Sequence, residues 1–326
     1  MRILITGASG LLGLNLALEA AKDHTVFGTI NKHAIRTDAF TVLQADLLAE
    51  GALERLLEQT QPDWVIHCAA LANLEDCEAQ PALAAQLNSE LPARLAELVT
   101  RGGARLLHVS TDAVFDGEKG DYRETDAPNP LSVYARTKLE GELAVAAACP
   151  QAIIARVNLF GWSSSGRRSL AEFFYYNLLE GRRVMGFTDV YFCPLLVNDL
   201  AALFLRMLAL GLSGLYHVVS RDCISKYEFG VSLARRFDLD PNLITPVSVS
   251  QAGLTAARSP NLTLRVDKLS QALGAPPPGL TEGIERFYQL HQQGYARWLR
   301  QLSQLPQDGE YGGDGHGDTN WQTSHR

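Results

Sequence analysis

The sequence predicts a doubly wound α/β fold, in which helices cover both faces of a parallel β-sheet. The first half of the chain alternates short apolar runs with helix-length segments, and such alternation implies right-handed crossovers. Several runs are continuously apolar, as expected for strands buried on both faces. The chain of 326 residues is 46% apolar and 20% charged. This composition is that of a globular protein with a sizeable core.

Six short strands are expected in the first half, because each run is apolar and often β-branched. They are Arg2–Thr6, Thr25–Ile30, Thr41–Gln44, Trp64–His67, Arg105–Val109 and Ala152–Val157. The helices expected between them include Leu11–Lys22, Gly51–Gln59 and Glu78–Arg101. After about residue 160 the rhythm changes, and we expect helices at Ser169–Gly181, Asp199–Leu210, Ser225–Phe237, Val266–Leu273 and Thr281–Leu302, with a strand at Leu215–Val219.

Charge and cysteine content exclude several classes of protein. A net charge of −7 leaves no broad electrostatic footprint for nucleic acid or an anionic membrane. The chain has five cysteines and no CxxC pair, so we expect neither a cysteine metal site nor a disulfide framework. The apolar stretches near the N-terminus and at Leu200–Val219 are interrupted by glycine or arginine, so neither predicts a membrane span. We therefore expect a soluble protein of the reducing cytoplasm.

Three glycines stand between the first strand and the first helix, where a dinucleotide would bind. Gly7, Gly10 and Gly13 allow a sharp turn, and Leu11 and Leu12 open the helix. Glycines let the backbone approach a pyrophosphate, while the helix N-terminus supplies N–H groups and partial positive charge. An ordinary strand–helix turn is the simpler alternative. The strand–turn–helix context favours a Rossmann-type sheet that binds a dinucleotide.

The end of the second strand bears on the choice of cofactor. Proteins that prefer NAD often place an acid there to bind the ribose 2′-hydroxyl. Here Asn31 and Lys32 follow the strand, and no acid appears before Asp38. Lys32, with Arg36 nearby, would balance a 2′-phosphate, although two solvated cations are nearly as good an explanation. We predict NADP, with NAD still possible.

A catalytic trio is predicted from Thr111, at the end of the fifth strand, and from Tyr134 and Lys138, one helical turn apart. A single YxxxK pattern also suits an amphipathic surface helix. Reduction of a ketone needs a proton for the developing alkoxide, and Tyr134 is the expected donor. A Lys138 ammonium at ~5 Å and an effective dielectric of ~20 would lower the tyrosine pKa by about two units. Thr111 would polarise the carbonyl oxygen.

Together these motifs resemble the short-chain dehydrogenase/reductase superfamily. Several segments match its cofactor contacts: one after the third strand, a small-residue loop after the fourth, and a structural asparagine on the next helix. The resemblance therefore implies cofactor contacts, beyond those of the glycine turn and the YxxxK pair, at Asp46, Leu47, Cys68, Ala69, Ala70 and Asn88.

Within the superfamily the chain is most similar to the extended branch that contains the dTDP-4-dehydrorhamnose reductase family. Residues 110–117 (STDAVFDG) resemble that family's STDxVFDG loop, and residues 69–78 resemble its AAxTxVDxxE segment. The likeness implies an NADPH-dependent reductase of a 4-keto nucleotide sugar. It also implies substrate contacts for Asp112, Phe115, Arg258 and Asn261. Ser259 and Arg265 depart from the family's pattern and put dTDP-rhamnose as the product in doubt.

The resemblance leaves two other functions open. The β subunit of methionine adenosyltransferase has this fold and binds NADP as a regulatory partner, and nucleotide-sugar epimerases belong to the same branch. A homodimer is possible. We expect residues 1–160 to form the dinucleotide-binding domain, to which 191–219 returns. We expect 161–305 to be mainly substrate-binding and 306–326 to be a disordered tail.

Overall fold

Residues 1–251 and 259–303 are described by the structure, a computed structural model. Seven strands form one parallel sheet at its centre: β1 (Arg2–Thr6), β2 (Thr25–Ile30), β3 (Thr41–Gln44), β4 (Trp64–His67), β5 (Arg105–Thr111), β6 (Ile153–Val157) and β11 (Gly214–Val218). Their spatial order is β11-β6-β5-β4-β1-β2-β3. The chain thus winds outward from β1 and then reverses at β4. Ligands of open parallel sheets bind at such a switch point, outside the carboxyl ends of the strands.

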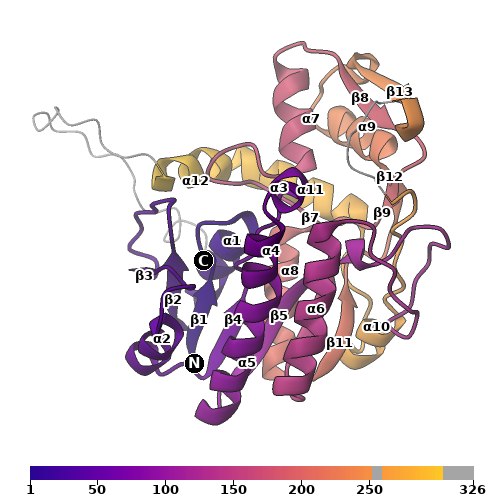
Figure 1. Cartoon of the computed structure of the whole chain (residues 1–326). Coiled ribbons are helices and arrows are strands. Elements are labelled where there is room, and N and C mark those ends of the chain that lie inside the picture. The colour runs from indigo at the N-terminus through magenta and orange to yellow at the C-terminus, as the bar shows by residue number, and fades with distance from the viewer. Residues whose placement is uncertain (252–258, 304–326) are drawn as a thin grey trace, which may run out of the picture.

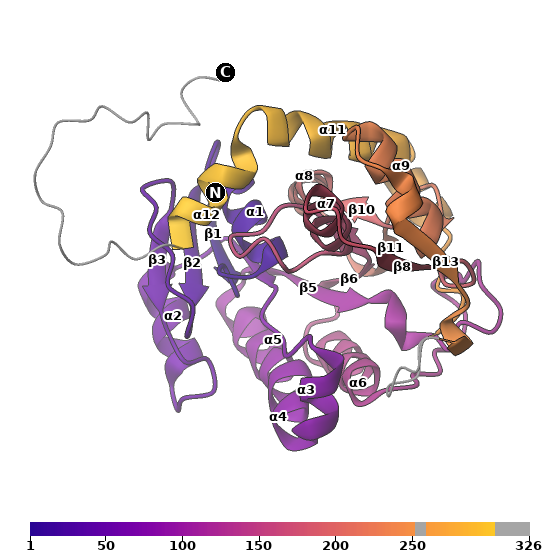
Figure 2. The ribbon, with the colours of Figure 1, turned by 90° about the horizontal axis from the view of Figure 1, so that it is seen from above.

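Helices cover both faces of the sheet (Figures 1 and 2). On one face lie α2 (Ala52–Thr60), α5 (Leu91–Gly102) and α6 (Val133–Ala148); on the other lie α1 (Leu11–Ala20) and α8 (Val197–Ala209). Each face buries an apolar core, represented by Leu4 and Val65 on the first and by Ile3 and Ile5 on the second. Side chains alternate along a strand, so both faces of β1 are buried as the continuous apolar run predicted. The doubly wound α/β fold is confirmed.

A second, smaller group of elements lies above the carboxyl edge of the sheet (Figure 1). It comprises α7 (Leu170–Leu179), β8 (Val184–Phe187), α9 (Lys226–Arg236) and β13 (Ile244–Val247), with β8 and β13 paired in parallel. Capping boxes at Ser169 and Ser225 begin the two helices. The other short elements are η2 (Asp112–Val114), β7 (Leu159–Phe160), β9 (Tyr191–Phe192), β10 (Leu195–Leu196), β12 (Ile224–Ser225), η3 (Pro241–Leu243), η4 (Val249–Gln251) and α10 (Asp267–Leu273), the last of which packs on β11.

Two segments that the sequence predicts as single helices are broken. Residues 78–101 contain the end of α3 (Leu74–Ala79), then α4 (Pro81–Ala85), the π-helix η1 (Gln86–Glu90) and α5. Pro81 begins a new helix because it has no N–H to continue the old one. The last segment divides into α11 (Leu280–Gln292) and α12 (Tyr295–Ser303) at Gly294, whose φ is 82°. The predicted tail at 306–326 lies outside the described residues.

None of the helices within 1–251 and 259–303 is both long enough and apolar enough to cross a membrane.

Candidate active site

The glycine turn between β1 and α1 lies at the carboxyl edge of the sheet and leaves no room for side chains. Gly7 has a φ of +71°, and a Cβ built on it would lie 2.9 Å from the backbone of Ala69. A Cβ on Gly13 would lie 2.2 Å from the carbonyl oxygen of Gly7. Gly10 starts α1 without a side-chain cap. Backbone N–H groups in the first helical turn are therefore the donors that this edge offers to an anion.

The loop after β4 is fixed beside the glycine turn by one hydroxyl. Thr6 Oγ1 accepts hydrogen bonds from the backbone N–H groups of Cys68 and Ala69, each at 3.2 Å. The same oxygen lies 2.8 Å from His67 Nδ1. Because β1 and β4 are paired up to Thr6 and His67, the small-residue loop lies beside the glycine turn at the carboxyl edge of the sheet.

The residues predicted near the adenosine half are accessible. Asn31 and Lys32 follow β2 and are exposed. Asp46, after β3, is also exposed, and its Oδ1 accepts a hydrogen bond from Leu48 N at 3.1 Å. Leu47 is half-buried. These contacts with a cofactor remain predictions.

The predicted trio converges at the end of β5. The Thr111 hydroxyl lies close enough to the Tyr134 hydroxyl to influence its pKa. Lys138, on the same helix as Tyr134, is 3% exposed. Its Nζ donates to the carbonyl oxygen of Val109 at 2.7 Å and lies 3.5 Å from His108 Nε2. Ser132 caps the helix that carries both residues.

The prediction that Lys138 lowers the pKa of Tyr134 is wrong. Burial raises the pKa of Tyr134 to about 12, and the nearby Thr111 hydroxyl opposes this only in part. Lys138 is directed toward the carbonyl of Val109, and its own pKa falls to about 8, chiefly because it is buried. Desolvation disfavours the charged form of each group. Tyr134 is therefore a protonated phenol across the physiological range, the state a proton donor requires.

Asn88 ties the helix of the trio to the loop after β4. Its Oδ1 accepts from Leu71 N at 2.9 Å, and its Nδ2 donates to Leu71 O at 3.0 Å and to Thr137 Oγ1 at 3.1 Å. The side chain is fully buried. These partners support the structural role implied by the resemblance rather than a direct cofactor contact.

Asp112 lies beside Thr111 and is buried. It accepts from Asn158 Nδ2 at 2.6 Å and from Thr111 Oγ1 at 3.2 Å. Burial raises the pKa of its carboxyl to about 6, against these hydrogen bonds and the charge of Lys226. Asn158 and Lys226 carry no motif, and sequence reasoning missed both because they lie far along the chain from Asp112.

The other three predicted substrate contacts are Phe115, Asn261 and Arg258. Phe115 is fully buried and stacks on Tyr122, with the ring centroids 4.1 Å apart. The guanidinium carbon of Arg156 lies 4.9 Å from the centroid of the Phe115 ring. The Phe115 side chain belongs to the core, which argues against a substrate contact. Asn261 Oδ1 accepts from Thr263 Oγ1 at 2.8 Å. Arg258 lies outside the described residues.

Arg265, one of the departures from the family pattern, forms an ion pair with Asp267 at 3.0 Å. This pair is exposed, so Arg265 behaves as a surface cation.

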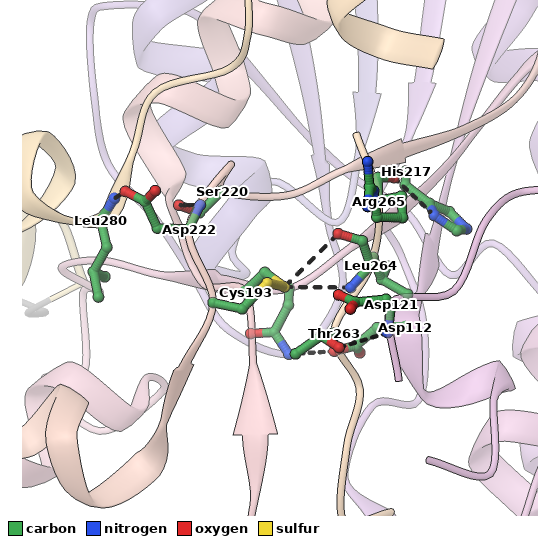
Figure 3. The surroundings of a disulfide bond; sticks show 12 residues. Asp112, Asp121, Cys193, His217, Ser220, Asp222, Thr263, Leu264, Arg265 and Leu280 are labelled. Carbon is green, nitrogen blue, oxygen red and sulfur yellow. Dashed lines mark hydrogen bonds between the residues drawn. A yellow bond between two sulfur atoms is a disulfide. The ribbon is translucent and has the colours of Figure 1, made fainter. Parts of the chain in front are cut away.

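A disulfide joins Cys193 and Cys223, so the expectation of no disulfide is wrong (Figure 3). In the antiparallel pair of β9 and β12, Phe192 lies opposite Ile224. The register therefore places the two cysteines opposite each other, with Cα atoms 4.1 Å apart. Sequence spacing could not show this, because the cysteines are 30 residues apart. The argument from cysteine content for a reducing compartment loses its support.

Comparisons with known proteins agree with this geometry. The RmlD substrate binding domain family matches residues 1–293. A dTDP-4-dehydrorhamnose reductase of Mycobacterium tuberculosis is 34% identical over 265 residues, 79% of this chain and 83% of its own. Methionine adenosyltransferase 2 subunit beta of Danio rerio is 32% identical over 278 residues, 82% and 84% of the two chains.

Among solved structures, a dTDP-4-dehydrorhamnose reductase from Clostridium acetobutylicum superimposes with a TM-score of 0.76 at 27% identity. The alignment covers 90% of this chain and all of that one. The fold, the convergent trio and the extent of these matches show that the chain belongs to the RmlD substrate binding domain family, within the extended short-chain dehydrogenases/reductases.

Proposed function

We propose that the protein reduces a 4-keto nucleotide sugar with NADPH. One observation carries the proposal: the Thr111 hydroxyl at the carboxyl end of β5 lies close to the Tyr134 hydroxyl, on the sheet edge that holds the glycine turn. A carbonyl oxygen placed at this pair would accept from both hydroxyls. The sheet edge is also where a dinucleotide binds in this architecture.

The chain supplies orientation and a proton. When bound, the nicotinamide cofactor would supply the hydride that reduces the carbonyl carbon. Thr111 would polarise the carbonyl oxygen, and Tyr134 would give its phenolic proton to the alkoxide as the charge develops. One hydride and one proton convert the ketone to an alcohol. Lys138 would stabilise the tyrosinate left behind and bind the ribose nearest the reacting ring.

The residues of the glycine turn fit a dinucleotide. Side chains are excluded from Gly7 and Gly13 by their neighbours, so the backbone itself borders the site. The uncapped start of α1 leaves N–H groups for a pyrophosphate. Lys32 is exposed at the end of β2 and, in the absence of an acid there, favours the 2′-phosphate of NADP over NAD.

The substrate class rests on the relatives. The Mycobacterium tuberculosis protein is named a dTDP-4-dehydrorhamnose reductase and covers most of the chain. Asp112, buried beside Thr111, and Asn261 remain candidates for a sugar contact among the described residues. Ser259 and Arg265 leave the nucleotide and the sugar to be determined.

The direct test is to incubate the purified chain with NADPH and a panel of 4-keto nucleotide sugars, including dTDP-4-dehydrorhamnose. Oxidation of NADPH, followed at 340 nm, should accompany formation of the reduced sugar. [4-²H]NADPH should transfer its label to carbon 4 of the product. NADPH binding without turnover of any member of the panel would refute the proposed activity.

The subunit-beta relatives support a second candidate, an NADP-binding regulatory subunit. Under this function, NADPH would bind, no keto sugar would be reduced, and the chain would alter the activity of a methionine adenosyltransferase added to the assay. The proximity of the Thr111 and Tyr134 hydroxyls favours the reductase, because a partner protein has no need of a proton donor at this edge.

A further inference from the structure

A buried ionic cluster lies behind the catalytic trio and is not explained by cofactor or substrate binding. Glu142 and Arg156 are 4% and 3% exposed. Arg156 Nη2 donates to Glu142 Oε2 at 2.7 Å, and Arg156 Nε donates to Oε1 at 3.0 Å. Ser110 Oγ donates to Oε1 at 2.5 Å. A buried charge pair is expensive to desolvate, and loss of one partner would leave the other charge buried and unpaired.

The cluster joins the three elements that form the site. Ser110 precedes Thr111 on β5, Arg156 lies on β6, and Glu142 lies on α6, one turn beyond Lys138. Ser110 and Arg156 are partners in the register of β5 and β6. The Glu142 carboxylate therefore attaches α6 to the strand end that carries Thr111, and Lys138 lies on the same face of the helix.

We propose that Glu142 is a positioning residue, whose carboxylate, bound by Arg156 and Ser110, fixes α6 against the end of β5 and keeps Lys138 protonated for its role in the trio. For turnover this inference rests on the proposed function, whereas the protonation of Lys138 can be measured without it.

The surroundings of Lys138 show why one carboxylate matters. His108, on β5, lies 3.5 Å from the Lys138 ammonium nitrogen, and the charge of Lys138 also acts on His67 and Cys68 at the end of β4. Burial lowers the pKa of His67 to about 3 and that of His108 well below its usual value, and it raises that of Cys68 to about 12. All three are therefore neutral near pH 7. Among the groups that influence Lys138, Glu142 supplies the negative charge that opposes its desolvation.

The low lysine content allows a direct measurement. The chain has six lysines: Lys22, Lys32, Lys119, Lys138, Lys226 and Lys268. Incorporation of ¹³C-labelled lysine gives few signals, and the Lys138→Met variant assigns the one of interest. Its chemical shift, followed against pH, reports the protonation of Lys138 in the folded chain without substrate or cofactor.

Glu142→Gln keeps the shape of the side chain and removes its charge. The midpoint for Lys138 should fall by about 1–2 pH units, as expected for a unit charge one helical turn away at an effective dielectric of about 20. Ser110→Ala is the matched control: it removes one hydrogen bond to the carboxylate and keeps the charge, so the midpoint should stay where it is. An unchanged midpoint in Glu142→Gln, or an equal fall in Ser110→Ala, would overturn the proposal.

Loss of one partner from a buried pair can prevent folding, so a double variant is needed. Glu142→Gln with Arg156→Gln leaves no unpaired charge and should still lower the Lys138 midpoint; a midpoint equal to that of the wild type would count against the proposal. If the chain is a reductase, the alkaline limb of its pH–rate profile should move with the midpoint. A chain without turnover would contradict the proposed function but leave the titration as a test of Glu142.

Discussion

Replacement of Lys138 by methionine should make the protein more stable and less functional. Burial lowers the pKa of Lys138 from 10.5 to about 8. At about 1.4 kcal/mol per pKa unit, holding the ammonium in this environment at pH 7 costs about 3 kcal/mol of folding free energy. Methionine has a similar length and no charge. Lys138→Met should therefore raise the free energy of unfolding by up to about 3 kcal/mol at pH 7.

The pH dependence separates this effect from ordinary repacking. Between pH 8 and 10.5 the unfolded chain binds the lysine proton and the folded chain does not, so the wild type gains stability as pH rises through this window. The advantage of the variant should therefore shrink toward pH 10. Urea unfolding at pH 7 and pH 10, followed by tryptophan fluorescence, measures the difference in the free energy of unfolding between the variant and the wild type. A variant less stable than the wild type at pH 7, or a difference that does not change with pH, would refute the reasoning.

Three further predictions concern other parts of the chain. Asp112→Asn should raise the free energy of unfolding by up to about 3 kcal/mol at pH 7 and have little effect near pH 4. The reason is that the carboxyl pKa rises from 3.8 to about 6 on folding, so the folded state is penalised only where the carboxyl is ionised. Urea unfolding at both pH values checks this prediction, and equal effects at both would contradict it. Cys223→Ser opens a disulfide that spans 30 residues and should lower the free energy of unfolding by about 3–4 kcal/mol under non-reducing conditions, whereas no difference from the wild type would mean that the bond does not form. Lys32→Glu should weaken NADPH binding more than NADH binding in fluorescence titrations, and parallel changes in the two affinities would remove the argument for NADP.

Apolar runs and helical periodicity in the sequence predicted the strands of the sheet and most of its helices. The continuous apolar runs of the first half correspond to the strands of the sheet, and β5 extends two residues beyond the predicted Arg105–Val109. The breaks at Pro81 and Gly294 interrupt segments whose apolar periodicity continues on both sides, so periodicity alone joined them. The Thr111–Tyr134–Lys138 trio was predictable because strand end and helical spacing are both visible in the sequence.

Contacts between distant segments could not be predicted. The Cys193–Cys223 bond follows from the register of β9 and β12, two-residue strands that leave no periodic signal. The Glu142–Arg156 pair depends on the packing of α6 against β6. The neighbours of Phe115 and Asp112 likewise differ, although both belong to one motif: Phe115 stacks on Tyr122 in the core, whereas Asp112 accepts a hydrogen bond from Thr111.

The comparison of wild type with Tyr134→Phe tests the central claim most directly. Phenylalanine keeps the ring and its packing but removes the proposed proton donor, so the fold and NADPH affinity should survive. Once a 4-keto nucleotide sugar is shown to turn over with the wild type, transfer of deuterium from [4-²H]NADPH to carbon 4 should slow by at least ~10²–10⁴-fold in the variant. Deuterium transfer at the wild-type rate in Tyr134→Phe would contradict the assignment of Tyr134 as proton donor.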